Sequence, residues 1–567
     1  MCSHGLTILK FGSSVLRNRE DLTRAVHEIY RWVREGDRVL AVVSAFGGTT
    51  NKLLEQAFSY GGDRDEHAVA ALVGTGEETA SALLSVALDR AGICSMVLDA
   101  ARISLRTNGP VLDAEPASVD EGRIWQAFRG VPVCVVPGFI GRTHEGSPSL
   151  LGRGGSDLTA LFLAQRLGAG KCRLIKDVNG LYEHDPADDP PPLRYRTANW
   201  DDALRLSGRI VQHKAIRFAK THRLSFEVGS LGSADVTVVG PGRPTFYSPV
   251  PAAPPLKVGL LGLGTVGLGV YRELTANPDL FEITGVAMRN VSKNRECFVS
   301  PHLLHSDPWE VVRTAPDVVI EAIGGQRPAG ELIAAALANR AHVVTANKAV
   351  IAHHGPALSR RAAENGRHLL FSAAVGGAVP MLESVARLAR TGPVTQLEGV
   401  INGTSTFILD QVAQGQNLAD AVTMAQQKGF AEQNPTFDLD GTDAAQKLVL
   451  LARAAFGADL DFAQISRSGI ANVDPKRVRE IAGSQQVLRL VASVKAGRNR
   501  LFARVGAEPL EATHPLARAR CEQNCLLIHR ANGEAVLLHG KGAGRWPTTE
   551  SMMADLFAVT RQRQALS

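Results

Sequence analysis

The sequence predicts an α/β protein built on parallel sheets. Short apolar runs, such as residues 39–43 and 318–320, alternate along the chain with longer helical segments, which is the order of strands and helices in parallel sheets. Another run, residues 258–261, leads directly into the glycine-rich turn GLGTVG and then into a helical segment. The length of 567 residues suggests about three or four domain-sized units.

The turn GLGTVG has the spacing that binds the pyrophosphate of a dinucleotide. Gly262 permits a tight turn, Gly264 lets the backbone approach phosphate, and Gly267 lets the helix pack closely. The helix that is predicted to follow, at residues 268–274, presents unpaired N–H groups and a positive dipole end to the anion. We therefore predict a Rossmann nucleotide-binding domain, with a purely structural glycine turn as the alternative. Because this turn lies in the middle of the chain, another domain precedes it.

The composition is that of an ordinary globular protein. The net charge of +6 is spread along the chain without a long basic block, which favours small anionic substrates over nucleic acid as partners. The seven cysteines are scattered and odd in number, which predicts reduced thiols in the cytoplasm. No apolar run is long enough to span a membrane, so no membrane association is expected.

In the first half of the chain, polar and glycine-rich residues follow predicted strands, where ligands bind at the carboxyl edge of a sheet. Residues 6–9 lead to Lys10 and the turn KFGSS, and residues 39–43 lead to SAFGGTTN, which contains Thr50. Lys10 could reach a phosphate group, and a surface lysine beside a turn is the alternative. The segment GTGEE, which contains Glu77, is predicted to precede an alanine-rich helix.

The segment LGRGGSDLT is predicted to open a helix. Glycines together with Arg153, Ser156 and Asp157 at a helix start form a cradle for an anion and its metal. The alternative, a capped helix after a flexible loop, would explain Ser156 and Asp157 but not an arginine between glycines.

Residues 6–230 resemble the catalytic domain of the aspartokinases, in the amino-acid kinase family. The motifs that carry the resemblance are KFGSSV, VVSAFGGTTN, GEE, GRGGSDLTA and KDVNGLYEHDP, in the order of the family. The resemblance implies an αβα sandwich that uses ATP with Mg²⁺ to phosphorylate L-aspartate to 4-aspartyl phosphate. It also implies that Lys10 stabilises the transferring phosphoryl group, while Asp157 positions the lysine network and the metal-bound phosphates. The other implied contacts are Thr50, Glu77, Arg153 and Ser156 for aspartate, and Asp177 and Tyr182 for the nucleotide.

Two departures from the family pattern keep an alternative open. The family usually reads KFGG, whereas this chain reads KFGSS, and the later His-Pro of the family is replaced by Gln212-His213-Lys214. The alternative is an inactive, kinase-like scaffold domain fused to the second half.

A proline-rich stretch, residues 236–256, is predicted to be a stiff, extended linker after a kinase-like domain of residues 1–235. Aspartokinases that resemble this chain usually carry small βαββαβ regulatory modules that bind threonine or lysine. Fewer than about thirty residues separate the two halves here, whereas even a small domain needs about 50. We therefore expect a short form without these modules, and no allosteric response of either activity to threonine or lysine.

The second predicted strand of the nucleotide fold, residues 281–287, indicates which dinucleotide binds. A fold that prefers NAD carries an acidic residue near the end of this strand to hold the ribose 2′-OH. This chain has Arg289 there, with Lys293 and Arg295 nearby. The basic side chains suit a 2′-phosphate, so NADP(H) is favoured, and an exposed basic loop is the alternative.

Further along, predicted strands at residues 317–321, 341–345 and 369–375 complete a parallel, doubly wound sheet. The turn TANK places Lys348 at the carboxyl edge of this sheet. Asp443 and Lys447 are one helical turn apart and share a helix face. A surface ion pair is the commoner arrangement for such residues, but several carboxylates precede Lys447 in a short span, which favours a polar pocket.

Residues 257–560 resemble homoserine dehydrogenase. The matching stretches are GLGTVG, TANK, VGGAVP, INGTSTFIL, the segment from Glu432 to Lys447, and GKGAG before PTT. The resemblance implies NADPH-dependent interconversion of aspartate semialdehyde and L-homoserine. Lys348 and Lys447 would be the catalytic lysines, with Lys447 as the proton donor. Substrate contacts would come from Glu432, Asp438 and Asp443, and cofactor contacts from Gly262, Gly264, Thr265, Val266, Gly267, Arg289, Lys348 and Gly542.

The same resemblance implies three domains in the second half: a Rossmann domain at residues 257–385, an α+β substrate and dimerisation domain at 386–540, and a C-terminal segment, 541–567, that returns to the nucleotide domain. A homodimer or homotetramer is expected. The family commonly has a glutamate where this chain has Ser372. A monovalent cation, Na⁺ or K⁺, would then bind the backbone carbonyls of Val375, Gly377 and Val379.

Together the two resemblances imply a bifunctional enzyme that serves threonine and methionine biosynthesis. A dehydrogenase with an inactive kinase-like scaffold is the first alternative. A nucleotide-sensing binding protein without catalysis is the second, and the presence of both Lys348 and Lys447 argues against it.

Overall fold

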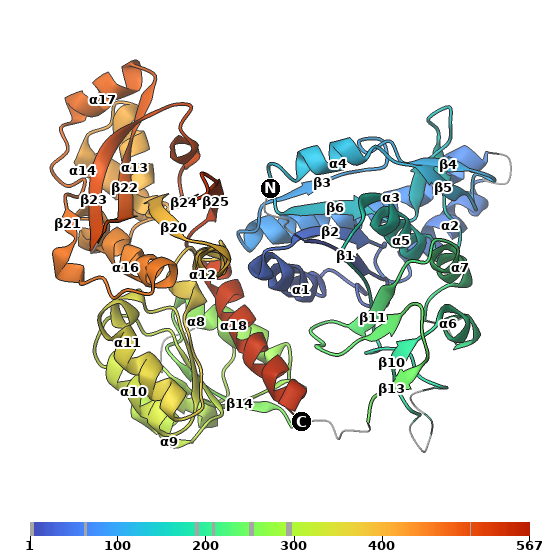
Figure 1. The fold of residues 1–567 in the computed structure, drawn as a ribbon, viewed down its shortest axis with the longest axis horizontal. Coiled ribbons are helices and arrows are strands. Elements are labelled where there is room, and N and C mark those ends of the chain that lie inside the picture. The colour runs from blue at the N-terminus through green and yellow to red at the C-terminus, as the bar shows by residue number, and fades with distance from the viewer. Residues whose placement is uncertain are drawn as a thin grey trace. The chain divides into compact units, whose positions relative to one another are not determined.

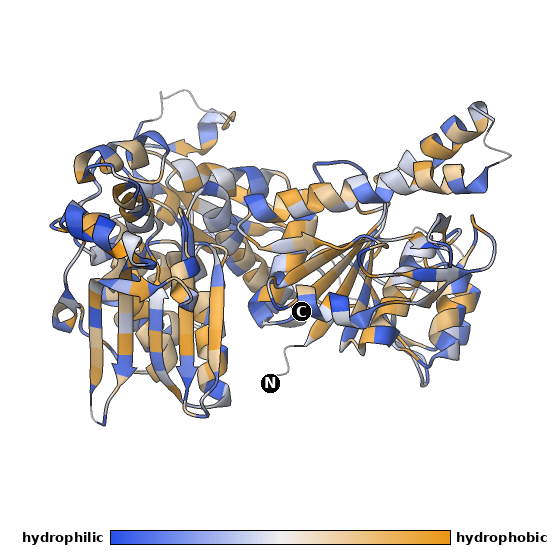
Figure 2. Cartoon of the chain, turned by 90° about the horizontal axis from the view of Figure 1, so that it is seen from above, coloured by the Kyte–Doolittle hydropathy of each residue, from blue (hydrophilic) through white to orange (hydrophobic). Residues whose placement is uncertain are grey.

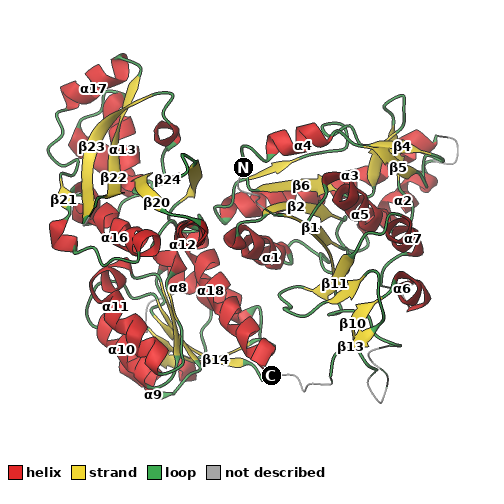
Figure 3. Cartoon of the chain, in the orientation of Figure 1, coloured by secondary structure: helices red, strands yellow, loops and turns green. Residues whose placement is uncertain are grey.

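A computed structural model describes residues 5–61, 65–185, 188, 192–206, 210–248, 254–290, 297–498 and 500–566. The chain divides into two compact units, residues 1–253 with 561–567, and residues 254–560. Each unit is an assembly of helices on sheets (Figure 3). Within the described ranges, no helix combines the length and the apolar character needed to cross a membrane.

The first unit is organised by a large, mostly parallel sheet (Figure 1). Strand β1, beside the middle strand of this sheet, is buried along its whole length, as expected for a parallel strand that is covered on both faces. In spatial order the strands are β13 (Thr245–Phe246), β10 (Tyr195–Ala198), β12 (Thr237–Val239), β11 (Phe226–Ser230), β9 (Lys171–Lys176), β1 (Leu6–Phe11), β2 (Arg38–Val43), β6 (Val133–Pro137) and β3 (Ser95–Val97).

Helices cover both faces of the large sheet. Alternate strand residues such as Ile8, Leu40 and Leu174 share a core cluster with α5, and no residue of α1 or α3 belongs to that cluster. Helices α1 and α3 instead contact each other and strands β2 and β6, so the unit is an αβα sandwich. The helices are α1 (Leu22–Glu35), α2 (Thr49–Ser59), α3 (Glu66–Arg90), α4 (Glu121–Ala127), α5 (Gly155–Leu167), α6 (Trp200–Leu206) and α7 (His213–Thr221). A small sheet adds β5 (Glu115–Ser118), β4 (Arg106–Asn108), β7 (Ile140–Arg142) and β8 (Pro148–Leu150).

The segment GTGEE does not precede a helix, as the sequence predicted, but lies in the middle of α3. Glycine costs a helix roughly 1 kcal/mol relative to alanine, and close packing explains why it occurs here. A Cβ on Gly74 would lie 3.2 Å from the Ile140 side chain, and one on Gly76 would lie 3.1 Å from Ala45. The glycines therefore let α3 approach the sheet, and this approach brings Glu77 into the interior.

The predicted linker also differs from the structure. Residues 237–239 and 245–246 form β12 and β13 of the large sheet, so the first unit continues past residue 235. Strand β12 pairs in parallel with β10 and antiparallel with β11. Pairing with distant strands is not visible in a local composition rich in proline and glycine, which is why the sequence placed the boundary too early.

The second unit contains a fully parallel sheet of the doubly wound type, with the order that a dinucleotide-binding fold requires. Its strands are β16 (Leu304–His305), β15 (Phe281–Ala287), β14 (Leu256–Leu261), β17 (Val318–Glu321), β18 (His342–Thr345) and β19 (Leu369–Leu370). Its helices are α8 (Thr265–Thr275), η1 (Pro301–Leu303), α9 (Pro308–Arg313), α10 (Ala329–Ala338), α11 (Lys348–Glu364) and η2 (Ser372–Ala374). Met552 and Leu556 of α18 (Arg545–Leu566) lie in the same core cluster as Val258 and Leu260 of β14.

The rest of the second unit is built on a largely antiparallel sheet. Its strands are β21 (Ser466–Arg467), β23 (Leu501–Glu511), β22 (Gln486–Ala496), β20 (Val394–Val400), β24 (Gln523–Arg530) and β25 (Ala535–Lys541). Its helices are α12 (Met381–Thr391), α13 (Gly403–Ala413), α14 (Leu418–Gln427), α15 (Thr436–Leu439), α16 (Thr442–Phe456), η3 (Phe462–Gln464), α17 (Pro475–Gly483) and η4 (Pro515–Arg518).

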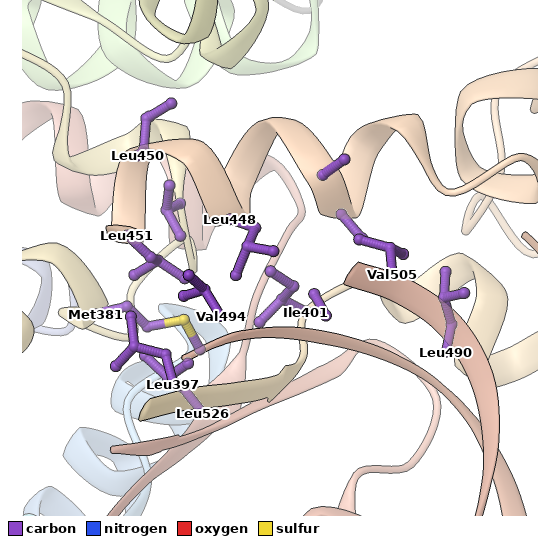
Figure 4. Packing of buried hydrophobic residues seen from close by; sticks show 14 of the residues in the cluster. Met381, Leu397, Ile401, Leu448, Leu450, Leu451, Leu490, Val494, Val505 and Leu526 are labelled. Carbon is purple, nitrogen blue, oxygen red and sulfur yellow. The ribbon is translucent and has the colours of Figure 1, made fainter. Parts of the chain in front are cut away.

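Helix α16 is anchored to the antiparallel sheet by a large apolar cluster. Figure 4 shows Leu448 and Leu451 of α16 directed toward Leu397, Val494 and Leu526 of the strands. The anchoring fixes α16, which carries Asp443 and Lys447.

The two sheet types also differ in Figure 2, where the strands of the large sheet are coloured mostly as hydrophobic and those of the antiparallel sheet alternate. The large sheet is covered on both faces, whereas the antiparallel sheet buries one face, and this difference explains the contrast.

Candidate active sites

A cavity of about 1040 Å³ opens in the first unit, at the carboxyl ends of β1, β2 and β9 and the amino end of α5. The structure brings together all the kinase-site residues that the sequence predicted. These lining residues are Lys10, Thr50, Glu77, Arg153, Ser156, Asp157, Asp177 and Tyr182. The turn KFGSS also lines the cavity, through Gly12, Ser13 and Ser14.

Asp157 lies between two buried lysines at the centre of this cavity. Its carboxylate contacts Lys10 Nζ at 2.7 Å and Lys176 Nζ at 2.8 Å. Burial opposes ionisation of Asp157, but the two ammonium groups outweigh it and hold its pKa at about 2. Burial lowers the pKa of Lys10 to about 8, although Asp157 acts in the opposite direction. The cluster is therefore a preformed cationic site, in which the Asp157 carboxylate fixes the positions of both lysines.

Sequence reasoning missed Lys176. It is the last residue of β9, which pairs in parallel with β1 so that Lys10 and Lys176 reach the same sheet edge. The signal in the sequence was its place just before Asp177, in the motif KDVNG, but the partner of a strand cannot be known from its own residues.

Glu77 is a buried carboxyl group beside the lysine cluster. Burial raises its pKa to about 7, against a hydrogen bond from the backbone of Ala45 and the charge of Lys10. Its Oε2 atom has no hydrogen-bond partner among the described residues. An acceptor of this kind suits an ammonium group, which would supply both a charge and donors.

The other predicted contacts lie at the rim or the first turn of a helix. Arg153 and Asp177 are exposed, whereas Ser156 is buried in the first turn of α5. The hydroxyl of Tyr182 donates to Asn179 Oδ1 at 2.5 Å, which fixes its ring at the edge of the cavity.

Residues 212–214 replace the His-Pro of the family pattern, and they make contacts of their own beside the cavity. Gln212 packs over the cradle, because a Cβ added to Gly154 would lie 2.3 Å from its side chain. Lys214 Nζ donates to Asp113 Oδ1 at 2.8 Å and to the carbonyl oxygen of Ala114 at 2.9 Å. Residues other than His-Pro thus support the loop beside the cavity.

In the second unit, Asp443 lies between Lys348 and Lys447. Its Oδ1 is 3.1 Å from Lys348 Nζ, and its Oδ2 is 2.8 Å from Lys447 Nζ. Lys447 also donates to the carbonyl oxygen of Ile401 at 2.8 Å. Burial opposes ionisation of Asp443, but the lysines outweigh it and hold its pKa well below the usual range. The charge of Asp443 raises the pKa of Lys348 in spite of burial.

Local structure explains how these side chains meet. Lys348 begins α11, whose first turn is capped by Asn347, and Asp443 lies in the first turn of α16 after Gly441. Gly441 has φ of +82°, a left-handed conformation that favours glycine. A carboxylate in the first turn of a helix is stabilised by the helix dipole. Lys447 follows one turn later on the same face.

Asn402 connects two of the predicted carboxylates, and sequence reasoning did not assign it a role. Its Nδ2 donates to Asp438 at 2.6 Å and to Asp443 at 2.8 Å, while its Oδ1 caps α13 by accepting from Ser405 N at 2.7 Å. Its position just before the helix-starting segment GTST was a recognisable capping signal. Burial, together with Asp443, raises the pKa of Asp438.

Glu432 is the one predicted substrate residue that makes no direct contact with this cluster. It is exposed, and its charge contributes to the raised pKa of Lys348 only behind those of Asp443 and Asp438. Gln426 holds its backbone by donating to the carbonyl oxygens of Glu432 and Gln433. Glu432 thus lies at the edge of the polar site.

The three glycines of GLGTVG have the geometry that their spacing predicted. Gly262 has φ of +100°, and a Cβ there would lie 2.6 Å from the carbonyl oxygen of Ala322. Gly264 faces open space, which leaves room for a ligand. A Cβ on Gly267 would lie 2.0 Å from the carbonyl oxygen of Gly262, so glycine permits the helix to begin against the turn.

Arg289 is exposed and lies two residues beyond the end of β15, at the edge where α8 begins. In this fold, a 2′-phosphate on the ribose would be contacted by a side chain at this position. Lys293 and Arg295, which the sequence assigned to the same basic loop, lie outside the described residues.

The segment predicted to bind a cation lies beside the predicted cofactor residue Gly542. A Cβ on Gly377 would be 3.0 Å from the backbone of Gly542, and one on Gly542 would be 1.8 Å from Asn524. Ser372, at the position of the family's glutamate, donates through its backbone and its hydroxyl to Asp555 at 3.0 and 2.7 Å. The cation site at the carbonyls of Val375, Gly377 and Val379 stays a prediction.

Family models match nearly the whole chain. Residues 5–225 match the amino acid kinase family, residues 262–372 the NAD-binding domain of homoserine dehydrogenase, and residues 380–557 homoserine dehydrogenase itself. The homoserine dehydrogenase of Synechocystis is 34% identical over 318 residues, which are 54% of this chain and 73% of that protein. The one from Corynebacterium glutamicum is 33% identical over 54% of this chain and 72% of its own length.

Among solved structures, homoserine dehydrogenase from Thiobacillus denitrificans is similar with 34% identity and a TM-score of 0.52, over 55% of this chain and 74% of that one. These matches confirm the predicted fold class and the predicted order of a kinase domain before a dehydrogenase. The chain therefore belongs to the homoserine dehydrogenase family through its second unit, and carries a domain of the amino acid kinase family ahead of it.

Proposed function

We propose that the kinase domain phosphorylates L-aspartate with ATP and Mg²⁺, and that the dehydrogenase interconverts aspartate semialdehyde and L-homoserine with NADP(H). The observation that carries this proposal is similar in both units: a buried carboxylate contacts two lysines, and at least one of these lysines lies at the carboxyl edge of a parallel sheet. Two assays of one purified preparation test it. Aspartyl phosphate is trapped as its hydroxamate with ATP and aspartate, and NADPH oxidation is followed with aspartate semialdehyde. A protein active only in the second assay would support the scaffold alternative.

In the kinase cavity, the chain's own residues supply position and charge, which provide most of the catalysis in phosphoryl transfer. Glu77 would hold the substrate ammonium group, and Thr50, Arg153 and Ser156 would orient its carboxylates. Lys10, aligned by Asp157, would neutralise charge that develops on the transferring phosphoryl group. ATP would supply that group from the side bordered by Asp177 and Tyr182.

In the dehydrogenase, NADPH supplies the hydride when it is bound. As the carbonyl carbon of the semialdehyde is reduced, its oxygen gains negative charge and needs a proton. Lys447 would donate that proton, and Lys348 would add a second positive charge. Asp438 and Asp443, with Glu432 at the edge, would orient the amino-acid part of the substrate.

Replacing Arg289 with aspartate should shift cofactor preference from NADP toward NAD. A carboxylate would repel the 2′-phosphate and could accept from a ribose 2′-OH. The ratio of kcat/KM for the two cofactors measures the change, which we expect to be on the order of tenfold or more. Arg313→Asp on α9, a surface arginine paired with Asp307, is a control of the same charge change. An unchanged ratio in Arg289→Asp would remove this residue from cofactor choice.

The raised pKa of Glu77 predicts the pH dependence of the kinase. Glu77 binds an ammonium group only when ionised, so kcat/KM for aspartate should fall as the pH drops below about 7. Rates measured between about pH 6 and pH 9 should show this acidic limb. Glu77→Gln should raise KM for aspartate and remove the limb. If the limb persisted in Glu77→Gln, another group would be responsible for it.

A monovalent cation at residues 375–379 and a homodimeric or homotetrameric assembly in the cytoplasm complete the proposal.

A further inference from the structure

We propose that Glu321 is a positioning residue of the dehydrogenase site. It fixes the turn just before Lys348 against the glycine turn that follows Glu321 itself. The inference rests on the proposed dehydrogenase activity. Glu321 is the last residue of β17 and is 0% exposed. An ionised side chain in the interior is costly unless its acceptor atoms are satisfied. In this protein hydrogen-bond donors from two neighbouring turns satisfy them.

The first turn follows Glu321 directly. Its Oε1 accepts from the backbone N–H groups of Ile323 at 2.9 Å and Gly324 at 3.1 Å. Gly324 and Gly325 have φ of +80° and +72°, and neither has an atom within 4 Å of a Cβ position. Glu321 therefore holds a left-handed glycine turn that borders open space at the carboxyl edge of the sheet, where ligands bind in this fold.

The second turn follows β18, which pairs with β17 so that Glu321 and Thr345 are neighbours. Oε2 of Glu321 accepts from the Thr345 hydroxyl at 2.5 Å. The Thr345 oxygen then accepts from the backbone N–H of Asn347 at 2.9 Å. A single hydroxyl thus relays the position of Glu321 to the backbone just before Lys348.

Asn347 closes the network between the two turns. Its Nδ2 donates to the carbonyl oxygen of Gly325 at 2.7 Å and, at 3.4 Å, to Oε1 of Glu321. Its Oδ1 caps α11 by accepting from Val350 N. The next residue is Lys348, whose Nζ reaches Asp443 at 3.1 Å. The place where Lys348 leaves the sheet is therefore set by groups that converge on one buried carboxylate.

The number of donors explains why a carboxylate is needed. Both oxygens of Glu321 act only as acceptors, which allows the Thr345 hydroxyl to donate to it and still accept from Asn347. A glutamine has one acceptor oxygen and one NH₂ group. Its NH₂ would face either the N–H groups of the first turn or the hydroxyl of Thr345. The first orientation removes the acceptor of Ile323 and Gly324, and the second reverses the bond to Thr345, whose hydroxyl hydrogen then loses its acceptor. Neither orientation changes the size of the side chain.

The test uses Glu321→Gln and the pair Thr345→Val and Thr345→Ser in the full chain. We expect kcat of NADPH oxidation to fall about 10- to 100-fold in Glu321→Gln and Thr345→Val, because small misplacements of a reacting group have effects of this size. KM for NADPH should rise by a smaller factor than kcat falls, since the glycine turn at residues 262–267 binds the pyrophosphate elsewhere. Thr345→Ser keeps the hydroxyl and should restore most of kcat.

Thr284→Val on β15 is the matched control, because this hydroxyl bonds to Thr314 rather than to the two turns, and kinase activity checks the rest of the chain. Wild-type kcat in Glu321→Gln, or equal losses in Thr345→Ser and Thr345→Val, would overturn the inference. If Glu321→Gln does not fold, the two Thr345 variants decide. A wild-type protein without dehydrogenase activity would instead overturn the proposed function.

Discussion

Replacing Lys447 with alanine is expected to lower kcat of the dehydrogenase by a factor of about 10² to 10⁴, which is the usual contribution of a general acid. This loss corresponds to about 3–5 kcal/mol of barrier. Lys447 is buried and lies between Asp443 and the carbonyl oxygen of Ile401. Water in the space left by the side chain would supply neither a fixed proton nor a fixed positive charge. The rate of NADPH oxidation measures the effect.

The control for this prediction is Lys476→Ala on α17, an exposed lysine in the same unit. It should leave kcat unchanged, and the kinase activity of Lys447→Ala should remain at the wild-type level. KM for NADPH should also change little, because Lys447 lies in the polar cluster of α16 rather than at the glycine turn. Near-wild-type kcat in Lys447→Ala would exclude it as the proton donor.

Replacing Asp157 with alanine is expected to abolish most aspartyl phosphate formation, with a loss of about 10² to 10³ in kcat. The carboxylate lies between Lys10 and Lys176, and its negative charge offsets their mutual repulsion. Without it, two buried ammonium groups would repel each other, and breaking a buried pair in this way typically costs about 3–5 kcal/mol of stability. The hydroxamate assay measures activity, and thermal unfolding reports the loss of stability.

Asp157→Asn separates the loss of charge from the loss of fold, because it keeps the shape of the side chain. We expect it to be as inactive as Asp157→Ala but more stable. Asp201→Asn, at an exposed pair with Lys220, is the surface control for the same change. Dehydrogenase activity in every variant shows whether the second unit is intact. Undiminished hydroxamate production in Asp157→Asn would show that this carboxylate does not organise the kinase site.

The sequence alone predicted the two parallel sheets, the nucleotide turn and the residues that line the kinase cavity or surround Asp443. These features are local: glycines at GLGTVG, an i and i+4 pair at Asp443 and Lys447, and polar residues just after apolar runs. Such patterns work because the carboxyl ends of parallel strands share one edge, so residues that follow different strands meet there. The similarity to known families then supplied the identity of the reactions.

Which of these residues contact one another depends on the pairing and packing of distant segments. The pairing of β1 with β9 added Lys176 to Asp157, and the pairing of β17 with β18 joined Glu321 to Thr345. The packing of α3 against the sheet explains why GTGEE lies inside a helix, and long-range pairing places residues 237–239 and 245–246 in a sheet instead of a linker. In each case the free energy comes from contacts between segments far apart in the chain, which local propensity does not encode.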